Sequence, residues 1–169
     1  CTGTGDMPIF IAKKFGDSVK ITGVDFSEKM LEIATKRAKE YKNLEFMNAD
    51  ALNLPFEDNS FDAVFISFGL RNLADLKAGI TELKRVTKKG GLVINLDMGK
   101  PKGILGFAFR LYFFGLVPLL GKLIHGSSEP YVYLPESCEG FPAQEELVRL
   151  FYELGFSEVK NYNFAFGAL

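Results

Sequence analysis

The sequence predicts an α/β fold with a doubly wound, mostly parallel sheet of the Rossmann-like kind, and three observations carry this prediction. A glycine-rich turn, residues 3–5, opens directly onto an apolar run that is compatible with a helix. A short apolar strand follows and ends on Asp25, 20 positions after Gly5. Beyond it, apolar strand-like and amphipathic helix-like segments alternate along the chain to about residue 100.

Length and composition limit the range of functions. A chain of 169 residues with 47% hydrophobic and 24% charged residues is expected to form a single globular domain over 1–169. A net charge of −1 gives no electrostatic case for binding nucleic acid. Two distant cysteines and one histidine indicate neither a disulfide framework nor a metal site, and they favour a reducing, cytoplasmic compartment. We expect the domain to be incomplete at both ends, with its first strand missing or truncated.

The elements can be placed from residue patterns. Strands are predicted at 19–24, 44–48, 61–68 and 92–97, with two final strands at 156–162 and from 164 onward. Helices are predicted at 28–41, 74–87 and 143–154. Ser27 is the expected N-cap of the first of these helices, whose buried stripe is predicted to contain Met30, Leu31, Ala34, Ala38 and Tyr41. The run 88–91, Lys-Lys-Gly-Gly, is interpreted as the stop signal of the second. The strand at 61–68 is expected to be covered on both faces.

The segment 103–124 breaks the alternation because it is almost wholly apolar. Its length would permit a membrane span, but Arg110 and Pro118 argue against one. Two interpretations stay open: a buried helical hairpin, or a helical cap whose apolar face is partly open. We expect a substrate cap over 103–142.

The residues of the glycine turn and of two strand ends point to one kind of ligand. Asp25 has the spacing of a carboxylate that binds ribose hydroxyls, although it could also be a plain turn residue. Pro8 stands where nicotinamide enzymes place a third glycine, which disfavours that class. Asp50 and Ala51 follow the next strand, where a carboxylate suits the amine of adenine, or where Asp50 simply ends the strand. Together these features indicate S-adenosylmethionine.

Five motifs sharpen this prediction: CTGTGD, GVDFSEKML, NADALNLPFEDNSFDAV, SFGLRN and ELKRVTKKGG. With them, the chain resembles the C-methyltransferase family of ubiquinone and menaquinone biosynthesis (UbiE/MenG type) over nearly its whole length. Two departures from the family pattern are mild: Lys89 replaces a proline, and Asp97 replaces a common glutamate.

The resemblance implies a substrate and site residues. The substrate would be a polyprenyl quinol, either demethylmenaquinol or 2-polyprenyl-6-methoxy-1,4-benzoquinol, methylated on a ring carbon by an enzyme at the inner face of the membrane. Thr4 would help to hold the methionine portion of the cofactor, and Ser67 would contact it near the sulfonium. The candidate cofactor-binding residues are Gly3, Thr4, Gly5, Asp25, Met30, Asp50, Ala51 and Ser67.

Two residues are the catalytic candidates. Arg71 could stabilise a quinol oxygen as it becomes anionic, and Asn72 could orient it. Arg71 could equally pair with Asp75 one turn later, and His125 is interpreted as a loop residue rather than a base. Two competing functions stay open: a methyltransferase with another small or lipophilic acceptor, and a non-catalytic binding module built on the nucleoside fold.

Overall fold

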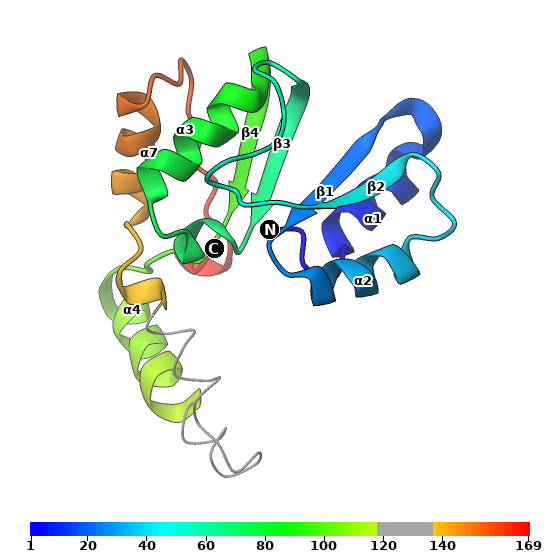
Figure 1. Ribbon diagram of the computed structural model, residues 1–169. Coiled ribbons are helices and arrows are strands. Elements are labelled where there is room, and N and C mark those ends of the chain that lie inside the picture. The colour runs from blue at the N-terminus through cyan, green and yellow to red at the C-terminus, as the bar shows by residue number, and fades with distance from the viewer. Residues whose placement is uncertain (118–136) are drawn as a thin grey trace. The chain divides into compact units, whose positions relative to one another are not determined.

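The computed structural model describes residues 1–117 and 137–169, and it divides into two compact units, Cys1–Asn95 and Leu96–Leu169 (Figure 1). Each unit is described by itself. His125 and the part of the expected cap from 118 to 136 lie outside the described residues.

The glycine turn leads into helix α1 (Asp6–Phe15) as the sequence predicts. Gly5 is the residue before the helix and has a φ of 84°, in the left-handed region that favours glycine. Asp6 lies in the first turn, where the positive end of the helix dipole favours a carboxylate. The helix buries Pro8 and Ala12.

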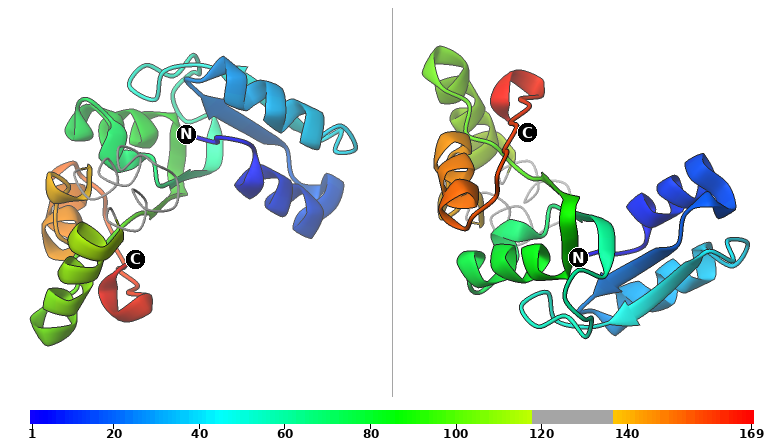
Figure 2. Two further views of the ribbon diagram at one scale, coloured as in Figure 1. Left: turned by 90° about the horizontal axis from the view of Figure 1, so that it is seen from below. Right: turned by 90° about the horizontal axis from the view of Figure 1, so that it is seen from above.

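Strands β1 (Ile21–Asp25) and β2 (Leu44–Asn48) pair in parallel, with Ile21 opposite Leu44 and Asp25 opposite Asn48. Helices α1 and α2 (Glu28–Arg37) lie on the same face of this strand pair (Figures 1 and 2). Both predicted strands are therefore confirmed, and Asp25 lies at the carboxyl end of its strand.

Helix α2 begins as predicted but ends earlier. Ser27 Oγ accepts a hydrogen bond from the Met30 N–H, which confirms the predicted N-cap. The helix stops at Arg37 instead of residue 41 because the chain must turn to start β2: the Tyr41 N–H donates to Ala38 O in that turn. Leu31, Ala34 and Ala38 are buried, but Met30 is 44% exposed, so its predicted place on the buried stripe is wrong.

Strands β3 (Phe61–Ser67) and β4 (Thr87–Leu96) form a second strand pair, connected through the 3₁₀ turn η2 (Leu70–Asn72) and helix α3 (Leu76–Val86). Asp75 caps α3 by accepting the Ala78 N–H at 2.9 Å. The apolar side chains buried most deeply in this region are Ile66, Leu70, Ile80, Leu83 and Val86. The described strands thus form two pairs. Of the residues of β3, only Ile66 is buried. The expectation that this strand is covered on both faces is therefore wrong.

The Lys-Lys-Gly-Gly run is not a helix stop. Helix α3 ends at Val86, and residues 88–91 belong to β4. The Ser60 N–H donates to Val86 O at 2.9 Å, and Lys88 forms an ion pair with Asp62. Strand pairing therefore takes over directly after the helix, where the local sequence signal indicated a turn.

The second unit contains helix α4 (Gly103–Arg110), the π-helical turn η3 (Leu111–Leu116), helix α7 (Gln144–Glu153) and the 3₁₀ turn η4 (Ala165–Gly167). The two predicted final strands are wrong. Ala165 and Phe166 have φ of 47° and 59°, which close a tight turn rather than extend a strand. Apolar residues alternate in this part of the sequence, but no described strand lies beside it to pair with. Without such a partner, an extended conformation is not stabilised. None of the helices described in the chain is long and apolar enough to cross a membrane.

Candidate cofactor site

The glycine turn is fastened to the end of β1. The Thr2 N–H donates to Val24 O at 2.9 Å, and the Gly3 N–H donates to Asp25 Oδ2 at 2.7 Å. Gly3 has a φ of 55°, and a Cβ added there would meet no atom within 4 Å. Backbone at this position is therefore open to the close approach of a ligand.

Asp25 is held by backbone N–H groups on both oxygens. Oδ2 accepts from Gly3, and Oδ1 accepts from the Ser27 N–H at 2.9 Å. A carboxylate offers about four acceptor positions, so two of them suffice for these contacts and others can accept the hydroxyls of a ribose. The carboxylate is fixed in place before any ligand binds.

The segment after β2 lies against the same strand end. The Ala49 N–H donates to Asp25 O at 3.2 Å, and the Asn48 side chain donates to Asp25 O at 3.1 Å. Asp50 Oδ1 accepts from the Leu52 N–H, which closes a local turn. The structure therefore brings Gly3, Asp25 and the Asp50 segment together through a chain of short contacts.

The end of β3 approaches the glycine turn from the other strand pair. A Cβ added to Gly69 would lie 2.6 Å from Cys1 Sγ, so only glycine permits this contact. Ser67 ends β3 two residues earlier and is half-buried. The predicted residues of the glycine turn and of the SFGLRN segment thus share one region of the first unit.

The catalytic candidates surround a strained residue. Phe68 has a φ of 52°, which is uncommon outside glycine and costs on the order of 1–3 kcal/mol. The Arg71 guanidinium carbon lies 5.6 Å from the centre of the Phe68 ring, and Asn72 Nδ2 donates to Phe68 O at 3.2 Å. The carboxylate of Asp75, the alternative partner of Arg71, caps helix α3. Such strain is typical of residues that position a functional group.

Thr4 and Met30 differ from the other candidates. The Thr4 hydroxyl donates to Asp6 Oδ2 at 3.1 Å and accepts from Arg37 Nη1 at 3.0 Å, so its side chain is engaged within the protein. Arg37 also donates to Thr4 O and forms a 2.6 Å ion pair with Asp6. Arg37 lowers the pKa of Asp6 through that hydrogen bond and its charge. Met30 lies in the first turn of α2 and is a little less than half exposed.

Sequence reasoning missed two residues that shape this region. Arg37 holds the glycine turn, and Ser27 supplies the second N–H for Asp25. Arg37 is separated from Thr4 by 33 positions, so no local spacing indicates their contact. Ser27 was predicted only as a helix cap, and its N–H is a backbone group that residue type does not identify.

Replacing Gly5 with alanine is expected to lower the free energy of unfolding by roughly 2–4 kcal/mol. The added Cβ would lie 3.1 Å from both Ala34 Cβ and Phe46 Cζ, at a φ of 84°. Urea unfolding followed by circular dichroism measures the change. Gly90→Ala is the matched control, because its φ of 79° is close to that of Gly5 and a Cβ there meets nothing within 4 Å. Equal losses in the two variants would contradict the packing argument.

Solved structures establish the class of this fold. A SAM-dependent methyltransferase from Aquifex aeolicus matches 91% of this chain and 68% of its own, with a TM-score of 0.65 and 21% identity. Phosphoethanolamine N-methyltransferase 2 from Haemonchus contortus, in complex with S-adenosyl-L-methionine, matches 92% of this chain and 31% of its own, with a TM-score of 0.66 and 24% identity. The fold is that of the SAM-dependent methyltransferases, as the sequence predicted.

Sequence comparisons identify the family. The model of the ubiE/COQ5 methyltransferase family matches residues 1–169. Demethylmenaquinone methyltransferase from Staphylococcus saprophyticus is 42% identical over 168 residues, which are 99% of this chain and 72% of that protein. The same enzyme from Staphylococcus aureus (strain JH9) is also 42% identical, over 70% of its length. The chain belongs to the ubiE/COQ5 family of SAM-dependent methyltransferases, which confirms the predicted family, enzyme class and cofactor.

Proposed function

We propose that this protein methylates a ring carbon of demethylmenaquinol, a polyprenyl quinol, in menaquinone biosynthesis. Relatives that are 42% identical to the chain over 168 residues bear the name of that activity. The single structural observation that carries the proposal is the 2.7 Å hydrogen bond between the Gly3 N–H and Asp25, beside open space at Gly3. It supports a preformed site for a nucleoside cofactor.

The cofactor would be held by the ends of three strands. Asp25 would accept the ribose hydroxyls, and Asp50 and Ala51 would meet the adenine. The remainder of the cofactor would be surrounded by Ser67, Met30 and the backbone of the glycine turn. Thr4 would contribute through its main chain, because its hydroxyl is engaged by Asp6 and Arg37. When bound, S-adenosylmethionine supplies a methyl group made electrophilic by the adjacent sulfonium.

The acceptor would be activated by the segment after β3. A quinol carbon becomes nucleophilic as the ring oxygen loses its proton, and a fixed cation stabilises the charge on that oxygen. Arg71 would supply the cation and Asn72 would orient the oxygen. Both side chains follow the strained Phe68, and Arg71 lies over its ring, which supports a fixed position for the guanidinium.

The prenyl chain would meet an apolar helical segment. The side chains of Ile104, Phe107, Leu111 and Leu116 recur at helical spacing and are 89%, 71%, 66% and 45% exposed. An exposed apolar stripe of this kind is typical of a surface that contacts lipid or a lipid-like ligand. We propose that the segment 103–142 is a substrate cap and that α4 contacts the membrane surface peripherally.

Methyl transfer to demethylmenaquinol embedded in phospholipid vesicles tests the proposal. With S-adenosylmethionine present, mass spectrometry should detect menaquinol, and Phe107→Ser should slow turnover on the prenylated acceptor more than on a soluble naphthoquinol. Preferred methylation of 2-polyprenyl-6-methoxy-1,4-benzoquinol would show that the acceptor is a benzoquinol and not the proposed naphthoquinol. Equal turnover on a soluble acceptor without a prenyl chain would contradict the role of the apolar stripe. Cofactor binding without methyl transfer to any acceptor would favour a binding module.

A further inference from the structure

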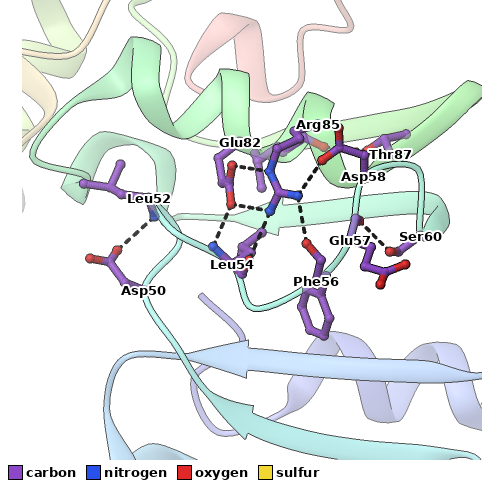
Figure 3. A network of polar contacts seen from close by, with 11 residues as sticks. Asp50, Leu52, Leu54, Phe56, Glu57, Asp58, Ser60, Glu82, Arg85 and Thr87 are labelled. Carbon is purple, nitrogen blue, oxygen red and sulfur yellow. Dashed lines mark hydrogen bonds and ion pairs between the residues drawn. The ribbon is translucent and has the colours of Figure 1, made fainter.

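Arg85 connects two of the sequence motifs (Figure 3). It belongs to the motif that contains residues 82–91, and its side chain contacts the motif that contains residues 54–62. We infer that Arg85, together with Glu82, is a positioning residue for cofactor recognition: it fixes the segment 50–58 so that Asp50 can meet the adenine. This inference rests on the proposed cofactor site. Arg85 would act through Asp50 and would not touch the cofactor itself.

The guanidinium of Arg85 uses every N–H it has. Nε donates to Glu82 Oε2 at 2.8 Å, and Nη2 donates to Glu82 Oε1 at 2.7 Å and to Leu54 O at 3.0 Å. Nη1 donates to Phe56 O and to Asp58 Oδ1, both at 2.8 Å. An arginine has five N–H donors, and five acceptors surround this one (Figure 3).

Glu82 also binds the segment 50–58 directly, through Leu54. Its Oε1 accepts the Leu54 N–H at 2.7 Å, so both the N–H and the C=O of Leu54 are bound by the Glu82–Arg85 pair. The Glu82 side chain is 13% exposed, and Leu54 is buried. Arg85 lowers the pKa of Glu82 through its hydrogen bonds, and Glu82 and Asp58 raise the pKa of Arg85. The pair therefore stays charged across the neutral range.

Short hydrogen bonds connect Leu54, which Arg85 and Glu82 hold, to Asp50. The Asn53 N–H donates to Asp50 O at 3.0 Å, and the Leu52 N–H donates to Asp50 Oδ1 at 2.9 Å. On the other side, the Ala49 N–H donates to Asp25 O. The Asp50 carboxylate thus lies in a tight turn that is anchored by Asp25 at one end and by Arg85 at the other.

The geometry explains why the chain has arginine at this position. Lysine has three donors on one nitrogen and cannot reach acceptors that surround a planar fork. Arg85→Lys keeps the charge but is expected to release Leu54 O or Phe56 O. The released segment would let Asp50 sample other positions, which weakens recognition of the adenine amine more than it affects the reacting groups.

The test compares two ligands that differ only at that amine. Isothermal titration measures the affinity of the full chain for S-adenosylhomocysteine and for its 6-deamino purine analogue, in which a hydrogen replaces the amine. The wild type should prefer the adenine compound at least about tenfold, which corresponds to about 1.4 kcal/mol. Arg85→Lys should lose most of that preference and raise the KM for S-adenosylmethionine severalfold, while kcat at saturation changes by less than about twofold.

Two further variants complete the test. Lys88→Met is the matched control, since it removes an ion pair between exposed side chains of β3 and β4 and should leave the preference unchanged. Asp58→Asn removes one charged partner of Arg85 at an exposed position and should reduce the preference partly, even if Arg85→Lys does not fold. An undiminished preference in every folded Arg85 or Asp58 variant would overturn the inference. A wild type that binds both ligands equally, or neither, would instead overturn the proposed adenine site.

Discussion

Asp25→Ala is expected to abolish measurable binding of S-adenosylmethionine and S-adenosylhomocysteine. The substitution removes the proposed partner of the ribose hydroxyls and leaves the N–H groups of Gly3 and Ser27 without their carboxylate. A hydrogen bond to a charged group contributes about 1.5–3 kcal/mol, so losing two of them, about 3–6 kcal/mol, weakens binding roughly 10²- to 10⁴-fold. Isothermal titration at millimolar ligand measures the loss.

Two variants separate ligand binding from folding in this test. Asp25→Asn keeps one acceptor oxygen but places an NH2 group against one of the two N–H donors. It should bind with intermediate affinity and have a thermal midpoint between those of the wild type and Asp25→Ala. Asp62→Asn removes a carboxylate of β3 that is 88% exposed and pairs with Lys88 of β4, and it should bind like the wild type. Wild-type affinity in Asp25→Ala would show that the ribose is held elsewhere.

Arg71→Ala is expected to lower kcat about 100-fold while leaving the affinity for the cofactor within about twofold. Removing one donor that stabilises a developing oxyanion typically costs 10²–10³ in kcat. Arg71 lies beside the strained Phe68, just after the carboxyl end of β3. Ligands of such sheets bind at this edge. Single-turnover methylation of demethylmenaquinol measures the chemical step separately from product release.

The controls for Arg71 address charge and specificity. Arg71→Lys keeps a cation and should recover part of the lost rate, because a point charge still stabilises an anionic oxygen. Arg149→Ala removes an exposed arginine of α7 and should leave kcat unchanged. A full rate in Arg71→Ala, with S-adenosylhomocysteine still bound, would remove Arg71 from the mechanism and favour its structural alternative.

Local patterns predicted the elements that have strong local signals. The alternation at 44–48 is β2, the Ser27 cap begins α2, and the run 143–154 corresponds to α7. Predictions failed where a neighbour in space decides the conformation. Residues 88–91 have the composition of a helix stop but pair as a strand with β3, and residues 164–167 alternate like a strand but close a turn.

The candidate site shows the same division. The glycine turn and Asp25 were predicted from spacing, because a tight turn before a helix restricts the residue types that fit, and the structure brings Gly3 and Asp25 into contact. The engagement of Thr4 by Arg37, and the anchoring of residues 54–58 by Arg85, could not be found in this way. Their partners lie about 30 positions apart in the chain, where no residue period connects them.

The sequence by itself determined the class of fold and the positions of the acidic strand ends, since both follow from residue types at short, fixed spacings. It also indicated the family, through the resemblance of its motifs. Only the tertiary structure decided how these positions are held. It joined the Gly3 N–H to Asp25 and surrounded Arg85 with five acceptors. The physical reason is that hydrogen bonds depend on distance and direction in space, and separation along the chain specifies neither.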